Sequence, residues 1–294
     1  MNRFLYSLAL FIGIPFAIFR LLIKDTHDAS WTRKLKNQFG IVEKIPGRVI
    51  WTHCVSVGEF NASKPLIEKL MIQYPNHQII ISTTTITGFN AVNNYYKNNV
   101  KHCFFPFDIP FILDSFIRKI NPEICILLET EIWPNLIHIL KKKNIPTALI
   151  NARLSDKSFQ RYDKYSAKLV KASLNNLSLI CAQNSFSSDR FISLGASQEK
   201  MITTGSLKFD SDNTIDDKSI KTLKKIIGDR KITVFASTRE GEEKQIIKSY
   251  INSADNINSL LIIIPRHPER FNEVFKLAKA SGLKVERRST ALQC

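Results

Sequence analysis

Glycine and proline are scarce in this sequence of 294 residues, ten and eleven in number, and there is no repeat or low-complexity run. Their scarcity argues against a repeat protein or a disordered chain. The five cysteines form no CxxC pair, so no zinc site is expected. Cys54, Cys125 and Cys181 fall in or beside apolar runs, as buried thiols do in a reducing compartment. A GxGxxG turn, a P-loop and a metal-spaced His/Asp/Glu cluster are also absent.

Negative charge is in short supply as well, with 26 Asp and Glu against 42 Lys and Arg, which gives a net charge of +16 and a pI near 9.7. Such an excess predicts an anionic partner: nucleic acid, an acidic membrane surface or a phosphorylated substrate. The basic residues form no patch interleaved with aromatics, so nucleic-acid binding is disfavoured. A DNA gel shift at physiological ionic strength would revive that alternative.

The first long apolar run covers residues 4–23 and is interrupted by Ser7 and Arg20. As a helix it would be about 30 Å long, enough to reach across a bilayer. A cleaved signal peptide is disfavoured because no small-residue cleavage pattern follows. The basic residues just downstream predict that residues 1–24 anchor the chain to the cytoplasmic face of the inner membrane. Because Pro15 and Arg20 interrupt the run, a span and a shallow monotopic insertion both stay open.

Strand-like and helical runs then alternate, which predicts a doubly wound α/β domain with a parallel sheet over residues 25–208. Its strands are expected at 49–54, 78–82, 100–104, 124–128, 147–150, 178–182 and 201–203. A polar stretch, 205–217, indicates a linker. Alternation resumes in a shorter second domain, residues 209–294, with strands expected at 231–236, 260–264 and 283–285.

Three acidic or basic residues of the first domain fall where a ligand cleft is expected. Glu59 follows the first strand and stands at the start of a helix, where it is either an ordinary first-turn Glu or a general base. Glu129, with Glu131 two residues on, ends a buried strand and is either in a solvated loop or at the same cleft. Lys208 lies in the linker, where it is either solvated or within reach of a phosphate.

Two further turns favour anions. In the second domain, the segment 237–243 and the pair Arg266 and His267 each follow a strand and open a helix. Backbone N–H groups and the helix dipole favour an anion there, and arginine adds bidentate binding of phosphate; the alternative is an arginine with a structural role. The hydroxyl-rich turn 81–88 of the first domain could hold an anion or sugar hydroxyls, but it is read as a capping turn.

Seven segments in order resemble the Kdo transferases, the family that adds 3-deoxy-D-manno-octulosonic acid to the lipid A precursor. They are WTHCVSVGEFNASKP, FPFDIP, LLETEIWPNL, INARLS, TGSLKFD, ASTREGEE and IIPRHPERF. The resemblance covers nearly all of the chain. It implies a GT-B fold of two Rossmann-like domains, with the acceptor site in the first, the CMP-sugar site in the second, and an N-terminal inner-membrane anchor.

The resemblance also assigns roles. It implies an inverting, metal-independent transfer of Kdo from CMP-Kdo without a cofactor. Glu59 is then the general base, Glu129 and Lys208 stabilise the transition state, and Arg266 and His267 contact CMP. The family continues with a GGHN-type motif followed by Glu-Pro, whereas this sequence ends at VERRSTALQC. We therefore expect a truncated chain with an incomplete donor domain. The competing hypothesis is an inactive, membrane-tethered protein that binds the lipid A precursor, together with anionic lipids, but not CMP.

Overall fold

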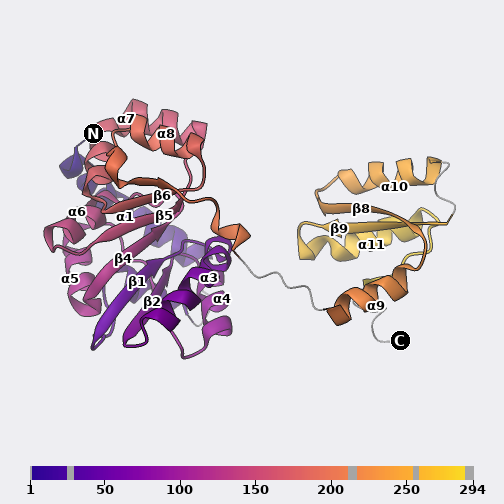
Figure 1. The fold of residues 1–294 in the computed structure, drawn as a ribbon, viewed down its shortest axis with the longest axis horizontal. Helices are drawn as coiled ribbons and strands as arrows, with labels where there is room; N and C mark the ends of the chain where they lie inside the picture. The colour runs from indigo at the N-terminus through magenta and orange to yellow at the C-terminus, as the bar shows by residue number, and fades with distance from the viewer. Residues whose placement is uncertain (1, 25–29, 211–216, 254–257, 289–294) are drawn as a thin grey trace. The chain divides into compact units, whose positions relative to one another are not determined.

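The computed structural model describes residues 2–24, 30–210, 217–253 and 258–288 (Figure 1). The chain forms two compact units, Met1–Asp212 and Asn213–Cys294, and each is considered by itself. The sequence placed the boundary after residue 208. Part of the predicted linker, residues 211–216, lies outside the described residues.

Unit 1 is built on a seven-stranded sheet in the order β3-β2-β1-β4-β5-β6-β7. Every neighbouring pair in it is parallel. The predicted parallel α/β fold is confirmed, and the strand order reverses direction between β1 and β4. The strands are β1 (Arg48–His53), β2 (His77–Thr83), β3 (Lys101–Phe104), β4 (Pro122–Leu128), β5 (Thr147–Ala152), β6 (Leu179–Ala182) and β7 (Met201–Thr203).

Apolar cores cover both faces of this sheet, because successive strand residues point to opposite sides. Val49 and Trp51 face one core, while Ile50 faces the other. The helices α3 (Val57–Gln73) and α4 (Ile86–Tyr96) pack on the Ile50 side. The opposite core takes α5 (Pro110–Ile120), α6 (Pro134–Lys142), α7 (Asp156–Asn176) and α8 (Ser185–Ser193). A shorter helix, α2 (Trp31–Gln38), lies beside β3.

The N-terminal helix α1 (Arg3–Lys24) is hydrogen-bonded near its N-terminus to the rest of unit 1. The Tyr6 hydroxyl donates to Asp108 Oδ2 at 2.9 Å, and Ser7 exchanges hydrogen bonds with the Asn135 side chain. Asp108 in turn accepts from the backbone N–H groups of Asn135 and Leu136, at 3.1 and 2.8 Å, and so caps α6. Two of the sequence motifs, FPFDIP and LLETEIWPNL, therefore contact each other at the place where α1 is hydrogen-bonded. Among the described residues, no helix has the length and apolarity needed to cross a membrane.

We expect Asp108→Ala to destabilise unit 1. The carboxylate is 3% exposed, and its removal would orphan two helix N–H groups and the Tyr6 hydroxyl. Each buried group left unpaired costs roughly 1–3 kcal/mol, and removing a buried carboxylate offsets part of that cost. The free energy of unfolding should therefore fall by about 2–4 kcal/mol. Urea unfolding measures it. Asp114→Ala, which removes a surface carboxylate, serves as the control and should cost less than about 1 kcal/mol.

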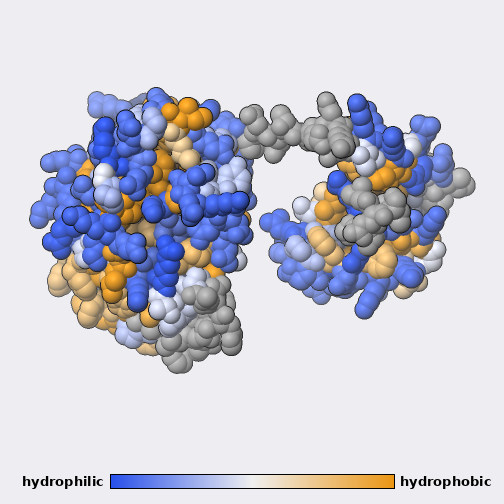
Figure 2. Space-filling model, turned by 90° about the horizontal axis from the view of Figure 1, so that it is seen from below, coloured by the Kyte–Doolittle hydropathy of each residue, from blue (hydrophilic) through white to orange (hydrophobic). Residues whose placement is uncertain are grey.

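Unit 2 contains a parallel pair of strands, β8 (Lys231–Thr238) and β9 (Ser259–Pro265), with the helices α9 (Asp217–Ile227), α10 (Glu242–Asn252) and α11 (Phe271–Ala280). Glu243 is buried in a bidentate ion pair with Arg270 and accepts from the Thr238 hydroxyl. The strand predicted at 283–285 is wrong, because these residues pair with neither strand of this sheet. Apolar residues reach the surface in both units (Figure 2).

Candidate functional site

The candidate site lies at the carboxyl ends of β1 and β4, where the strand order of unit 1 reverses and ligands bind in open α/β sheets. Glu59 stands in the first turn of α3, which Ser56 caps. Its carboxylate accepts the Val55 N–H at 2.8 Å and the Ser56 hydroxyl at 3.3 Å. Burial raises the pKa of Glu59 above its usual range, against the Val55 hydrogen bond, which lowers it. The carboxylate is therefore held rigidly, and it binds a proton more readily than an exposed one.

Two more carboxylates come from the segment after β4. Glu129 has a left-handed backbone, with φ of 54°, and its N–H donates to the Ile150 carbonyl of β5. A non-glycine residue in this conformation is strained, and such strain concentrates at functional sites. Glu131 is largely buried. Burial, followed by the charge of Glu59, raises the pKa of Glu131 to about 7. Glu59, Glu129 and Glu131 thus form one electrostatically coupled acidic cluster.

His53, the last residue of β1, lies next to Glu131 of this cluster. Its ring is fully buried and stacks on Phe105 at 3.9 Å between centroids. Nδ1 lies 3.1 Å from the Ser82 carbonyl oxygen, and Nε2 lies 3.8 Å from Glu131 Oε2. Burial lowers the pKa of His53 to about 3, so the imidazole is neutral near pH 7. If the proton sits on Nδ1 and is donated to Ser82, Nε2 is a bare acceptor that faces the Glu131 carboxyl.

Lys208 belongs to a short 3-10 turn, η2 (Leu207–Phe209), that packs against α3. The Leu207 N–H donates to Asn151 Oδ1 at 3.1 Å, which fixes this turn to the end of β5. Asn151 itself is buried and has a left-handed φ of 52°. The structure therefore packs the Lys208 segment, part of the predicted linker, against the helix that carries Glu59.

Arg266 and His267 belong to unit 2, at the carboxyl end of β9. The Arg266 N–H donates to the Thr238 carbonyl at the end of β8, so the ASTREGEE and IIPRHPERF motifs lie side by side. His267 Nδ1 is 3.8 Å from Glu269 Oε1, and both Arg266 and His267 are exposed. These two residues form the candidate site of unit 2, which is considered by itself.

The remaining polar turn of unit 1 has a structural role. Thr85 caps α4 by accepting the Gly88 N–H, and Thr84 donates to the Val55 carbonyl. The reading of 81–88 as a capping turn is therefore confirmed. Within the described ranges, no group of three or more His, Cys, Asp or Glu side chains is placed to hold a metal ion.

Solved structures with a similar fold include UDP-GlcNAc 2-epimerase from Neisseria meningitidis bound to UDP-GlcNAc, at a TM-score of 0.53 and 14% identity. That match covers 79% of this chain and 69% of the epimerase. A UDP-N-acetylglucosamine 2-epimerase assigned as putative, from Listeria monocytogenes, matches at a TM-score of 0.54 and 12% identity, over 81% of this chain and 67% of that one. At these identities, the likeness defines the fold class only.

The sequence comparisons define the family. The family model for 3-deoxy-D-manno-octulosonic-acid transferase (Kdo transferase) matches residues 33–211. The chain is 38% identical to the 3-deoxy-D-manno-octulosonic acid transferase of Haemophilus influenzae, over 99% of this chain and 69% of that protein. It is also 34% identical to a bifunctional glycosyltransferase/methyltransferase of Fusobacterium nucleatum, over 92% of this chain and 42% of that protein. The chain belongs to the Kdo transferase family, as its motifs predicted.

Proposed function

We propose that this chain is the acceptor-binding and partial donor-binding part of a GT-B glycosyltransferase that moves Kdo from CMP-Kdo to the lipid A precursor. The observation that carries the proposal is the acidic cluster at the sheet's reversal point, in a chain of the Kdo transferase family. The chain spans 69% of the Haemophilus influenzae relative and 42% of the Fusobacterium nucleatum relative. The transfer activity of the whole protein is therefore a proposal.

Glu59 acts as the general base in this mechanism. A sugar hydroxyl of the acceptor attacks the anomeric carbon of Kdo, the bond to the CMP phosphate breaks, and the hydroxyl proton passes to Glu59. Two features support this role: the carboxylate is fixed by Val55 and Ser56, and its pKa is raised toward the working pH. Glu129 and Lys208 stabilise charge as the glycosidic bond breaks, and the packing of η2 on α3 supports placing Lys208 in this role.

Arg266 and His267 bind the CMP phosphate in this proposal, at a turn between a strand and a helix. We expect Arg266→Ala to weaken CMP binding by roughly 10- to 100-fold, as the loss of a charge-assisted bidentate contact does. Calorimetric titration with CMP measures the effect. Arg288→Ala removes the same charge from another exposed position of unit 2 and should bind CMP as the unchanged chain does. Equal affinities for both variants and the parent would remove Arg266 from the site.

The cytoplasmic face of the inner membrane is the proposed location, and α1 supports it. Its exposed side chains include Phe4, Leu5, Leu8, Phe11, Ile12 and Phe16, while Tyr6 and Ser7 bond to unit 1. A helix docked on one face and apolar on the other is typical of in-plane insertion into a membrane surface. Anionic lipids suit the net charge of +16.

Leu8→Glu combined with Phe11→Glu should release the chain from vesicles of phosphatidylcholine and phosphatidylglycerol. Both side chains are exposed, and neither makes the hydrogen bonds that dock α1, so those bonds should stay intact. Two charges on the inserting face should lower the partition coefficient by at least about tenfold. Flotation with vesicles measures this, and Ile72→Glu, at an exposed position of α3, is the control. Unchanged flotation of the double variant would contradict membrane insertion through α1.

The competing function is an inactive protein that binds the lipid A precursor. The complete acidic cluster in unit 1 is compatible with acceptor binding alone. CMP binding separates the two functions, since only the transferase should bind the donor nucleotide.

A further inference from the structure

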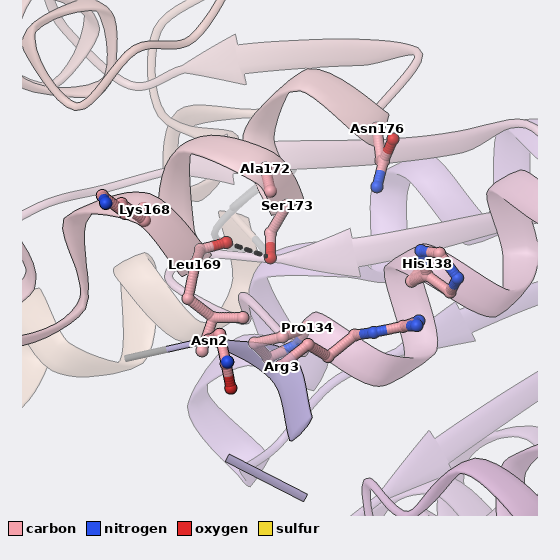
Figure 3. A pocket seen from close by; sticks show the side chains of 9 residues that line it. All are labelled: Asn2, Arg3, Pro134, His138, Lys168, Leu169, Ala172, Ser173 and Asn176. Carbon is pink, nitrogen blue, oxygen red and sulfur yellow. Dashed lines mark hydrogen bonds between the residues drawn. The ribbon is translucent and has the colours of Figure 1, made fainter. Parts of the chain in front are cut away.

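A cavity of about 250 Å³ lies between α1, α6 and α7 in unit 1 (Figure 3). Three of its lining residues, Arg3, His138 and Lys168, are basic or can carry a positive charge, and no acidic residue lines it. Within the described part of the chain, none of these three forms an ion pair with a carboxylate. The cavity therefore collects positive charge without a counterion from the protein.

Arg3 lies on the face of α1 that is turned toward unit 1. It is three and four residues before Tyr6 and Ser7, which bond to unit 1, so all three share one helix face. In Figure 3 the Arg3 side chain extends from α1 toward His138 on α6. Arg3 and His138 thus present a guanidinium and an imidazole, both able to donate hydrogen bonds, to the same cavity. Since the docking bonds fix the first turns of α1, this arrangement is built into the fold.

The lining suits a phosphate group. A guanidinium binds two phosphate oxygens at once, a lysine ammonium adds a third contact, and the amides of Asn2 and Asn176 are further donors. Leu169 and Ala172 provide an apolar wall for the carbon skeleton attached to the phosphate. The same helix also carries exposed apolar side chains, among them Phe4, Leu8 and Phe11. A ligand with both a phosphate and acyl chains would match both features of this region.

We propose that this cavity binds the phosphate group of a membrane lipid. The inference rests on the proposed membrane location and adds to it a headgroup site between α1, α6 and α7. A lipid held there would fix the orientation of unit 1 on the membrane, since α1 is bonded to the domain rather than tethered loosely.

The test measures co-sedimentation of the full chain with vesicles made of equal parts phosphatidylcholine and phosphatidylglycerol. Arg3→Gln combined with Lys168→Gln removes two positive charges from the cavity. Lys69→Gln combined with Lys157→Gln removes the same charge from exposed positions of α3 and α7 outside it. We expect the cavity variant to bind at least roughly tenfold more weakly than the control variant, because it loses directed phosphate contacts as well as charge. Circular dichroism verifies that both fold.

Equal losses in the two double variants would show attraction by net charge alone and overturn the proposal. A second arm adds glycerol phosphate in excess at matched ionic strength. Weaker binding of the unchanged chain to the vesicles, with no such effect on the cavity variant, supports a lipid headgroup in the cavity, because the soluble analogue competes for the same site. Binding of glycerol phosphate that leaves vesicle binding unchanged assigns the cavity to a soluble phosphate and overturns the lipid. The Leu8→Glu/Phe11→Glu double variant distinguishes failure of the headgroup site from failure of the proposed membrane location. If that variant detaches while the cavity variant binds as its control does, the membrane location stands and the headgroup site fails.

Discussion

Glu59→Gln should lower the rate of Kdo transfer by roughly a hundred- to ten-thousand-fold, the range that general base catalysis contributes. Glutamine keeps the size of the side chain and can still accept the Val55 N–H, so α3 should begin as before. What it loses is the ability to take the proton of the attacking hydroxyl. The assay requires a transferase that includes this chain together with a complete donor domain, with CMP release followed over time.

Two comparisons make the Glu59 result specific. Glu68→Gln changes an exposed carboxylate on the same helix, where Glu68 accepts from the Tyr95 hydroxyl, and should leave turnover within about twofold. Acceptor binding by Glu59→Gln should also change little, because the general base acts mainly in the transition state. Normal turnover of Glu59→Gln would remove Glu59 from the chemistry. A joint loss of acceptor binding and turnover would make it a binding residue instead.

Most of the unit 1 sheet could be predicted from sequence because its strands are continuous apolar runs. All seven predicted strands are present, and their ends differ by at most two residues from the prediction, as at Arg48–His53 and Thr147–Ala152. Parallel strands buried on both faces need such runs, and the helices between them fix the crossovers. The strand expected at 283–285 failed because a short apolar segment forms a strand only if a neighbour supplies hydrogen bonds.

The site was harder to predict than the sheet. Glu59 and Glu129 could be placed because parallel strands end at a common edge, and the structure adds that their strands are neighbours at the reversal point. His53 was missed, since a histidine that ends an apolar strand gives no sequence signal of its burial or of Glu131 nearby. Asp108 was missed for the same reason, because its partners Tyr6 and Asn135 are 102 and 27 residues away. Contacts over such separations depend on tertiary packing and leave no local pattern.

The pH dependence of unit 1 stability should change in Glu131→Gln. The folded state raises the pKa of Glu131 from 4.5 to about 7, so the folded chain binds this proton more tightly than the unfolded chain. The stabilisation by the proton is complete below about pH 4.5 and is lost as the pH rises through 7. A shift of this size corresponds to about 3 kcal/mol at most, and about 2 kcal/mol is expected because Glu131 stays partly exposed.

Glutamine mimics the protonated acid, since it has nearly the same shape and stays neutral at any pH. The difference in unfolding free energy, Glu131→Gln minus parent, should therefore be near zero at pH 4.5 and rise by about 2 kcal/mol up to pH 8. Urea unfolding at half-unit pH steps measures it. Glu43→Gln, at an exposed position, should show no such trend. His53 titrates only in the unfolded chain over most of this range, because burial holds its folded pKa near 3, and this contribution is shared by both proteins and cancels in the difference. A difference that falls with rising pH would contradict the raised pKa of Glu131 and would mean that a nearby cation stabilises its carboxylate.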